Sequence, residues 1–478
     1  MKYETLIGLE VHVELVTETK LFCSCSAKFG GEPNTHACPA CSGMPGMLPI
    51  LNRRAVDLAI TAGTLLGCDI SRVTAFDRKS YYYPDLPASY QTTQHFAPIA
   101  TCGEVDIETS TGKKSVRIKQ IHLEEDAGKL IHDTLTNATL IDYNRAGVPL
   151  IEIVSEPCLS SAEEAVAYLE LIRSRLRFAR VSDCRMEQGS MRCDVNLSVH
   201  PVGSDKLGVR TEIKNMNSLS AIIRAIEYEA ARHVDALLGG TEVLVEETRR
   251  WDDELGKTIP MRGKETAGDY RYFPDPCIMP VVIDDKWYSS VKATLPELPE
   301  AKRARFTGEL GLSRYDADLI CQSRTLCDVF EAAYAVCHSA KEVANWLISD
   351  CMSLLNKRQM TPDELCVDAH SLGRLIRLCM DGTVSRGNGK KILCAMLDSP
   401  IDPAAYAREN DLIVSADTDR MDEVIAAAVA SEPKAVADYR SGKEKALLAI
   451  FGKCMKELRG NCDPTMLRRA LIAYIEKQ

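Results

Sequence analysis

Long apolar runs are missing from this sequence. No stretch approaches the roughly 18 consecutive apolar residues that a membrane-spanning helix needs. The opening segment, MKYETLIGLE, has no basic stretch followed by an apolar one, so it does not resemble a secretory leader. Low-complexity segments and convincing internal repeats are lacking as well. We therefore expect a soluble cytoplasmic protein that makes no membrane contact.

The sequence also lacks the usual phosphate-binding loop. The segment TGKKS at 111–115 looks similar to part of that loop. However, the first glycine of the G-x-x-x-x-G-K-[ST] signature would have to be residue 107, which is Ile107. Any nucleotide site in this protein must therefore be of another kind.

The composition is that of a globular chain with several domains. With 478 residues, of which 45% are hydrophobic, the sequence is long enough for about two to four domains with full cores. Its 19 cysteines are an odd number, and most of them stand singly among apolar residues, as Cys68, Cys321 and Cys379 do. This pattern favours small buried hydrophobic side chains over disulfides.

The charge is distributed unevenly along the chain. The formal net charge of −10 argues against a protein that coats nucleic acid indiscriminately. Residues 433–478, however, hold ten Lys or Arg and five Asp or Glu, a balance of +5 that leaves −15 for residues 1–432. A basic tail on an acidic body suits a protein that touches an RNA at one place. The alternative is a merely solvated helix surface.

The pattern of apolar residues divides the chain into three parts. Residues 1–294 alternate strand-like runs, such as LIEIV and MPVVI, with turns rich in Pro and Gly and with a few helices. A hinge with prolines, TLPELPEAKRARF, leads into residues 295–405, where the apolar spacing is helical. After a second break at LDSPIDPAAY, residues 406–478 are helical again. We predict an α+β fold with a mixed body, a helical middle domain and a small helical tail domain.

The stretch LIGLEVHVEL at residues 6–15 alternates apolar and polar residues and predicts a half-buried strand. Its polar side carries Glu10 and His12, about 7 Å apart along the strand. This side either faces water or points into a cleft, as metal ligands or proton carriers do. Glu152 favours the cleft, because LIEIV surrounds it with apolar residues and an unpartnered buried carboxylate costs on the order of several kcal/mol.

A second group of acids lies in IHLEEDAGK, where Glu124, Glu125 and Asp126 are adjacent at the end of a predicted strand. Three neighbouring acids repel one another unless a cation sits among them. Oxygen-rich sites of this kind, with one imidazole, suit Mg²⁺.

Basic and polar residues in turn-like segments suggest contacts to phosphates: Arg78, Lys79, Arg145, Arg192, Asp194, Lys214 and Asn215. Acids for a metal and bases for phosphates are what phosphoryl transfer requires. The alternative is that these acidic loops and basic turns belong to an ordinary surface.

Four cysteines have the spacing of a metal site. The segment LFCSCSAKFGGEPNTHACPACSG contains a C-x-C pair and a C-x-x-C pair, twelve residues apart: Cys23, Cys25, Cys38 and Cys41. Two close thiolate pairs joined by a loop with Gly and Pro are what a tetrahedral, structural zinc site requires. The alternatives are four free thiols or a redox pair, and His36 is a possible substitute ligand.

Seven motifs together resemble one known family: IGLEVHVEL, FDRKSYYYPDLP, HLEEDAGK, NRAGVPLIEIVSEP, GSMRCDVN, EIKNMNS and DYRYFPDP. The sequence resembles the B subunits of the aspartyl/glutamyl-tRNA amidotransferases, and the motifs run in family order across residues 1–276. The tail segment KAVADYRSGKEKALLAIFGKCMK resembles the C-terminal domain of that family, so the resemblance covers nearly the whole chain. One departure is DPCIMPV, where Cys277 stands in a loop that is more acidic or richer in proline in the family.

The resemblance implies a heterotrimer. Its A subunit is a glutamine amidase that hydrolyses glutamine, and its small C subunit clamps the assembly together. B subunits of this family bind mischarged Glu-tRNA(Gln) or Asp-tRNA(Asn) and use ATP and Mg²⁺ to phosphorylate the side-chain carboxylate of the attached amino acid. Ammonia then attacks the acyl phosphate to give Gln-tRNA(Gln) or Asn-tRNA(Asn). The implied fold is an ATP-grasp or glutathione-synthetase-like cradle over residues 1–294, with a zinc-binding insertion at 23–41, followed by a helical domain and a tRNA-contacting tail domain.

Carried over to this sequence, the resemblance implies a catalytic set that consists of Lys79 and four ligands of Mg²⁺: Glu10, His12, Glu125 and Glu152. The choice of Glu125 over Glu124 rests on the motif alone. Contacts to ATP or to the substrate are expected from five further residues: Arg145, Arg192, Asp194, Lys214 and Asn215. The four cysteines are expected to hold a structural Zn²⁺ that braces the loop near the acceptor end of the tRNA.

The chain has no G-x-S-x-G elbow and no cysteine that resembles a glutaminase nucleophile, so we expect negligible glutaminase activity from it alone. Two other functions remain open at this point. A zinc-ribbon RNA-binding protein without catalysis would have no reason to bury Glu152 in LIEIV. An ATP-dependent ligase that acts on a small amino acid without RNA would leave the basic tail idle, so removal of residues 406–478 would leave its turnover unchanged.

Overall fold

The computed structural model describes residues 2–133, 137–204, 206–240, 242–263, 269–414, 418–441, 443–458, 462 and 464–477. The chain divides into a first unit, Met1–Leu298, and a second unit, Pro299–Gln478. In the part of the chain that is described, the first unit combines strands and helices and the second is built from helices. The predicted mixed α+β class is therefore confirmed. The predicted subdivision of the helical part at residues 405/406 stays a prediction.

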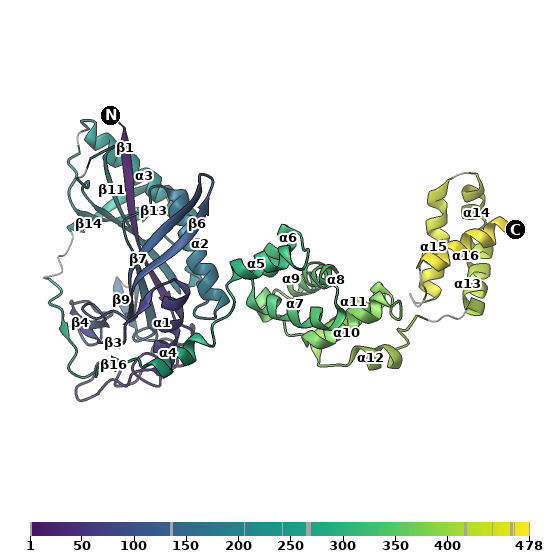
Figure 1. Ribbon diagram of the computed structural model, residues 1–478, viewed down its shortest axis with the longest axis horizontal. Helices are drawn as coiled ribbons and strands as arrows, with labels where there is room; N and C mark the ends of the chain where they lie inside the picture. Colours follow the sequence, from purple (N-terminus) through teal and green to yellow (C-terminus); the bar gives the residue numbers. More distant parts are fainter. Residues whose placement is uncertain are drawn as a thin grey trace. The chain divides into compact units, whose positions relative to one another are not determined.

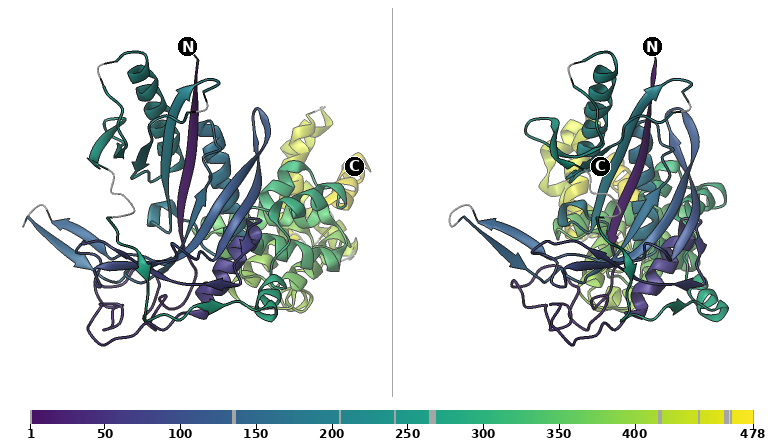
Figure 2. Two further views of the ribbon diagram at one scale, coloured as in Figure 1. Left: turned by 60° about the vertical axis from the view of Figure 1, so that its left-hand side comes forward. Right: turned by 90° about the vertical axis from the view of Figure 1, so that its left-hand side faces the viewer.

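A large sheet forms the centre of the first unit (Figures 1 and 2). Neighbouring strands are antiparallel, except that β12 (Thr211–Lys214) and β13 (Glu247–Asp252) pair in parallel. From one edge to the other, the nine described strands are β14 (Lys257–Gly263), β13 (Glu247–Asp252), β12 (Thr211–Lys214), β11 (Met191–Pro201), β1 (Tyr3–Glu14), β10 (Pro149–Ser155), β7 (Gly112–Glu125), β6 (Ala100–Thr109) and β2 (Asp69–Ile70).

The central strand β1 has one apolar and one polar face, as its alternation predicts. Ile7, Leu9, Val11 and Val13 are at most 1% exposed and belong to the main hydrophobic core. Full burial of such a side chain contributes about 1.5–3 kcal/mol. The helices α1 (Arg53–Leu65), α2 (Ala162–Phe178) and α3 (Leu219–Leu237) pack against the strands on this side. The polar residues of β1 therefore project from the opposite face of the sheet.

Each of these three helices begins at a residue that caps its first turn. Ser161 accepts a hydrogen bond from the backbone N–H of Glu164 at the start of α2, and Ser218 caps α3 in the same way. Asn52 caps α1. Caps of this kind stabilise a helix by about 1 kcal/mol and fix where it begins.

A small sheet lies against β7 and brings further side chains to the polar face of the large sheet. It consists of β15 (Phe273–Pro274), β4 (Asp77–Ser80) and β5 (Tyr90–Thr93). The other described elements of the first unit are the pair β3 (Val73–Thr74) and β16 (Val281–Val282), the hairpin of β8 (Lys129–Asp133) and β9 (Ala138–Asp142), the short helix η1 (Met186–Gln188) and α4 (Asp285–Lys292). The hairpin stands away from the large sheet in Figure 2.

The second unit begins with α5 (Pro299–Gly308). Its further described helices are α6 (Arg314–Ile320), α7 (Arg324–Cys337), α8 (Ala340–Asn345), the π-helix η2 (Trp346–Cys351), α9 (Met352–Lys357), η3 (Pro362–Glu364), α10 (Ala369–Met380), α11 (Arg386–Asp398), α12 (Pro403–Glu409), α13 (Thr418–Ser431), α14 (Pro433–Arg440), η4 (Glu444–Ala446), α15 (Leu447–Glu457) and α16 (Pro464–Lys477). Residues from α13 to α16 form a hydrophobic core of their own, from Ile425 to Ile475.

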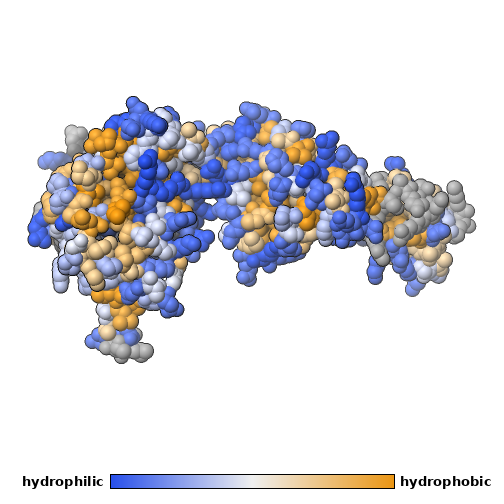
Figure 3. All heavy atoms as spheres, turned by 90° about the horizontal axis from the view of Figure 1, so that it is seen from below, coloured by the Kyte–Doolittle hydropathy of each residue, from blue (hydrophilic) through white to orange (hydrophobic). Residues whose placement is uncertain are grey.

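Exposed apolar side chains gather on one face of the first unit (Figure 3). Large exposed hydrophobic residues of this unit include Met44, Leu48, Ile50, Val73 and Val282. Patches of this kind mark interaction surfaces in soluble proteins. Among the described residues, no helix is both long enough and apolar enough to cross a membrane.

Candidate active site

The register of the large sheet brings polar residues from four strands side by side. His12 of β1 lies opposite Glu152 of β10, which in turn lies opposite His122 of β7. On the other side of β1, Glu10 lies opposite Asp194 of β11. Residues that lie directly opposite each other in antiparallel strands point to the same face. These five side chains therefore share the polar face of the sheet.

A cavity of about 610 Å³ opens over this face. The strands of the large sheet form its floor, with Glu10, His12 and Glu152 among the lining residues. The small sheet and the segments next to it supply the opposite wall: Lys79, Tyr83, Thr93, His95, Tyr270 and Tyr272. The cavity thus combines acids, imidazoles, lysines and aromatic rings, which is typical of a site for charged substrates.

One group in the cavity could hold a metal ion. His12, Glu124 and Glu152 each offer a ligand atom, and these atoms lie within 4.8 Å of one another. His12 Nε2 and Glu152 Oε2 are 3.9 Å apart. Glu124 is oriented by β5, because Thr93 Oγ1 and Gln91 Nε2 both donate hydrogen bonds to its carboxylate.

The electrostatics of this group favour a cation. Burial, together with the neighbouring carboxylates of Glu124 and Glu10, raises the pKa of Glu152 well above its ordinary value. Burial acts to lower the pKa of Lys79, but the charges of Glu124 and Glu152 outweigh it and raise that pKa. Crowded carboxylates need a proton or a cation between them. The cavity is therefore suited to bind positive charge on its floor and to hold a lysine above it.

A second group of acids lines the same cavity. Glu10, Asp194 and Glu212 offer ligand atoms within 4.8 Å of one another. Lys214 Nζ pairs with Asp194 and lies 3.1 Å from Glu212 Oε1. Burial acts to lower the pKa of Lys214, whereas these two carboxylates raise it and prevail. In the described structure this group thus already contains a cation from the protein.

Glu125 does not join either group. Its side chain lines a neighbouring cavity of about 370 Å³, and its Oε1 accepts a hydrogen bond from the backbone N–H of Thr92 at 3.1 Å. Successive residues of a strand point to opposite faces, so Glu124 and Glu125 cannot both line the polar face of the sheet. The structure therefore places Glu124 in the position next to His12 and Glu152 that the sequence motif had assigned to Glu125.

The two arginines and the asparagine predicted as substrate contacts lie outside the large cavity. Arg192 donates a hydrogen bond to Asp126 at 2.7 Å. Arg145 donates to the backbone oxygens of Ala127 and Gly128 and approaches the same Asp126 to 3.6 Å. Asn215 is exposed and has a positive φ of 68° just after β12. The structure thus brings together Glu10, His12, Lys79, Glu152, Asp194 and Lys214, but not these three residues.

Sequence analysis missed several residues of the cavity: His95, Gln120, His122, Glu212, Tyr270 and Tyr272. A signal for two of them is present in IKQIHLEED, where Gln120, His122 and Glu124 alternate with the buried Ile121 and Leu123. The same alternation singles out Glu124 rather than Glu125. The two tyrosines lie in the family motif DYRYFPDP, but no alternation of apolar residues indicates that they reach the cavity.

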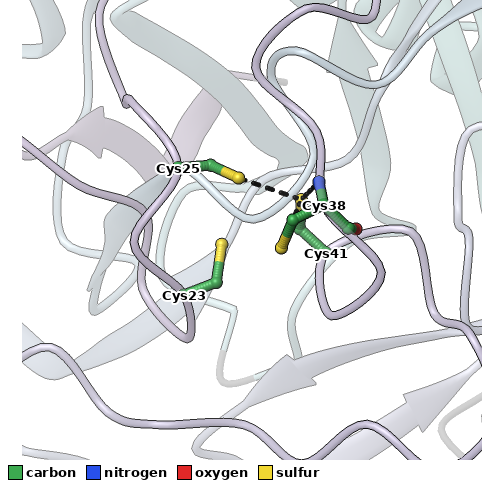
Figure 4. Close-up of side chains that lie close together, drawn as sticks. All are labelled: Cys23, Cys25, Cys38 and Cys41. Atoms are coloured by element: carbon green, nitrogen blue, oxygen red, sulfur yellow. Dashed lines mark hydrogen bonds between the residues drawn. The ribbon is translucent and has the colours of Figure 1, made fainter.

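The four cysteines meet in the loops that follow β1 (Figure 4). Their sulfur atoms lie within 4.8 Å of one another, with Cys41 Sγ 3.9 Å from Cys38 Sγ and 4.0 Å from Cys25 Sγ. A tetrahedron of sulfurs about 2.3 Å from a zinc ion has edges of about 3.8 Å. A hydrogen bond from Cys23 lowers the pKa of Cys41, and the nearby charge of Lys20 acts in the same direction. The geometry fits a tetrahedral metal site.

The fold and the cavity define an α+β protein with a site for charged substrates, and comparison with known proteins gives its family. A family model described as the GatB/GatE catalytic domain matches residues 5–289, and one described as the GatB domain matches residues 328–475. The chain is 47% identical to the B subunit of the aspartyl/glutamyl-tRNA(Asn/Gln) amidotransferase from Agathobacter rectalis, over 99% of both chains. It is 46% identical to the corresponding protein of Thermoanaerobacter pseudethanolicus, over 100% of both.

The chain therefore belongs to the family of aspartyl/glutamyl-tRNA(Asn/Gln) amidotransferase B subunits. This confirms the resemblance found in the seven motifs. The alternative of a zinc-ribbon RNA-binding protein without catalysis is not supported, because the matched residues 5–289 include the whole cavity and correspond to a catalytic domain.

Proposed function

We propose that this chain uses ATP to phosphorylate the side-chain carboxylate of Glu-tRNA(Gln) or Asp-tRNA(Asn) in its large cavity, and that ammonia derived from glutamine displaces the phosphate there. The products are Gln-tRNA(Gln) or Asn-tRNA(Asn), ADP and phosphate. The observation that carries this proposal is the crowding of Glu10, Glu124 and Glu152 beside His12 on the floor of the cavity. A carboxylate is a poor acyl donor, and transfer of the γ-phosphoryl group to its oxygen creates a leaving group.

The chain's own residues have distinct roles in this proposal. Lys79 and Lys214 line the cavity and can face the phosphate oxygens of ATP and the carboxylate of the substrate. His12, Glu124 and Glu152 would hold Mg²⁺, for which two oxygens and one imidazole are a suitable donor set. When bound, that ion offsets the negative charge of the transferring phosphoryl group. Glu125, Arg145 and Arg192 would act from outside the cavity by holding the strand end around Asp126.

The cysteine group would hold Zn²⁺ in a structural role. All four ligands come from the protein, which leaves no open position for substrate. The loop between the two cysteine pairs is fastened to residues 141–144. Asn34 donates to the oxygen of Ile141, and Asn144 Nδ2 donates to the oxygen of Glu32. A metal that fixes this loop would also fix the turn that carries Arg145.

The partners follow from the family and from the surface of the first unit. Glutamine hydrolysis would come from an amidase, the A subunit, and a small C subunit would complete a heterotrimer. The exposed apolar patch is a suitable surface for one of them. The first unit would form the ATP-grasp-like cradle, and the basic tail, residues 406–478, would contact the tRNA. A cytoplasmic location is part of the same proposal.

The experiment that tests this function is ATP hydrolysis by the assembled complex, with and without Glu-tRNA. We expect mischarged tRNA to stimulate hydrolysis and Glu124→Gln to reduce the stimulated rate on the order of 100-fold, because one charged ligand of the cation is lost. Glu125→Gln should reduce this rate less, since its side chain lies in the neighbouring cavity. Binding of tRNA should be unchanged in both variants.

Glu108→Gln is the matched control, because Glu108 lies on β6 with an exposed side chain and pairs only with Lys113 in the described structure. Its rate should equal that of the native complex. If Glu124→Gln hydrolyses ATP as fast as this control does, the carboxylate group is not the phosphorylation site.

A further inference from the structure

Lys20 is a fully buried lysine next to the cysteine group. It is 0% exposed and stands directly after the turn that leads from β1 into the cysteine loop. Its Nζ donates a hydrogen bond to the backbone oxygen of Tyr143 at 3.1 Å and lies 3.5 Å from Cys41 Sγ. Among the described residues it forms no ion pair with a carboxylate. A buried ammonium without an anion is costly, so its position calls for a negative partner.

The cysteine group supplies that negative charge once it holds a divalent metal. Four thiolates around Zn²⁺ carry a net charge of −2, and this charge lies in a partly buried loop. One ammonium at 3.5 Å from a ligand sulfur reduces the net charge of the assembly to −1. Groups that hydrogen-bond to metal ligands typically change metal affinity 10–100-fold.

Lys20 lines the cavity of about 370 Å³ together with Cys41 and Glu125, and of these two side chains Cys41 is the one that its Nζ contacts. Gly147 has a φ of +82°, and a Cβ atom added there would lie 3.5 Å from Lys20 Cδ and 3.7 Å from Cys41 Cβ. The backbone N–H of Leu21 donates to the oxygen of Gly147 at 2.8 Å, which holds the lysine against this turn. The turn and the cysteine loop thus place the Nζ of Lys20 between a carbonyl oxygen and the sulfur of Cys41.

We propose that Lys20 is the built-in counter-ion of the cysteine metal site and increases its affinity for zinc. This inference rests on the zinc assignment made above and is independent of the ATP-dependent chemistry. Lys20 acts through Cys41 and is a positioning residue, not a metal ligand. Its second contact, to Tyr143, connects the metal to the turn that precedes Arg145.

The test is the zinc affinity of the full chain, measured by competition with a chromogenic chelator. Lys20→Met keeps the length of the side chain and removes its charge, and we expect 10–100-fold weaker zinc binding, as is typical for loss of a group that supports a ligand. Lys20→Gln is the second neutral variant, and because it can still donate to Tyr143, a folding defect specific to methionine does not decide the result. Equal zinc affinity in the native chain and in both variants would overturn the proposal.

A metal site with less negative charge distinguishes a counter-ion role of Lys20 from a packing role. Cys23→His keeps four ligands but removes one negative charge, and Cys23 is not a partner of Lys20 in the described contacts. In this background Lys20→Met should cost clearly less affinity than in the native site. An equal loss in both backgrounds would overturn the counter-ion role. A native chain that binds no zinc would overturn the metal assignment as well, while leaving the ATP-dependent activity of the assembled complex untouched.

Discussion

Two glutamates of the first unit, the half-buried Glu152 and the fully buried Glu229, have opposite surroundings. Glu152 lies on β10 among other carboxylates, and the pKa of its carboxyl is raised by burial and by Glu124 and Glu10. Glu229 lies on α3 and is 0% exposed. Burial would raise the pKa of Glu229 too, but hydrogen bonds from His233, Arg232 and Thr258 lower it to about 2.

The partners of Glu229 neutralise it completely within the protein. Arg232 Nη2 lies 2.5 Å and His233 Nε2 lies 3.2 Å from its Oε1, while Thr258 Oγ1 donates to its Oε2 at 2.7 Å. Arg249 approaches the same carboxylate to 3.8 Å. These residues join α3 to β13 and β14, so the network holds the edge of the large sheet to its covering helix.

A structural carboxylate can be distinguished from a functional one by the charges that surround it. A carboxylate that the fold surrounds with cations stabilises the fold and has no capacity left for a ligand. A carboxylate that the fold surrounds with other carboxylates is under repulsion until something positive enters. On this basis we assign a structural role to Glu229 and propose that the group around Glu152 is a binding site.

The largest expected effect is on stability at Glu229. Glu229→Gln removes the fully buried carboxylate that Arg232, His233 and Arg249 share, so the two arginines keep only Glu242 and Glu247 as carboxylate partners in the described structure. Breaking a buried charge network in this way costs about 3–5 kcal/mol. Urea-induced unfolding of the first unit should show this loss. Glu227→Gln, an exposed position on the same helix, should change stability by less than about 0.5 kcal/mol. A neutral result at Glu229 would remove the contrast between the two glutamates.

The second effect is on the pH dependence of the stability, to which Glu229 contributes. Because its pKa is lowered to about 2 in the folded state, its contribution is complete above the unfolded pKa of about 4.3 and is lost as the pH falls toward 2. A shift of this size corresponds to about 3 kcal/mol. The stability difference between the native chain and Glu229→Gln should therefore be constant near neutral pH and narrow below about pH 4.5. A difference that stays constant down to about pH 3 would contradict the depressed pKa.

The sequence predicted the members of the two candidate metal-binding groups to different extents. The cysteine group could be predicted from spacing because its ligands lie within one segment, from Cys23 to Cys41, and their proximity needs no knowledge of the sheet. The carboxylate group comes from three strands that are far apart in the chain, and which residues meet depends on strand register. Alternation in β1 and the apolar neighbours of Glu152 indicated a shared face, and the register puts Glu124 rather than Glu125 beside His12 and Glu152 on it. Which of the two glutamates binds a metal stays a prediction.

The fold class could be predicted from the sequence for a similar reason. The alternation of β1 and the helical spacing after residue 298 are local patterns, and such patterns predict the type of secondary structure directly. The small sheet of β15, β4 and β5 pairs residues 77–78 with residues 273–274, and no local pattern predicts such a contact. Lys79 lines the cavity because β4 belongs to that sheet, which explains why its position could not be predicted from local alternation.

The smallest expected effect has the opposite sign and concerns Glu152. In a metal-free sample, Glu152→Gln removes a half-buried carboxylate that is repelled by Glu124 and Glu10, so we expect the variant to be more stable than the native chain by about 1 kcal/mol. With Mg²⁺ the order should reverse, because the native site gains stability from the bound ion in proportion to the logarithm of its concentration. Thermal unfolding with chelator and with Mg²⁺ measures both states, and Glu108→Gln should follow the native chain in each. If Glu152→Gln lowers stability in the metal-free protein, as Glu229→Gln does, the two glutamates have the same structural role and the comparison fails.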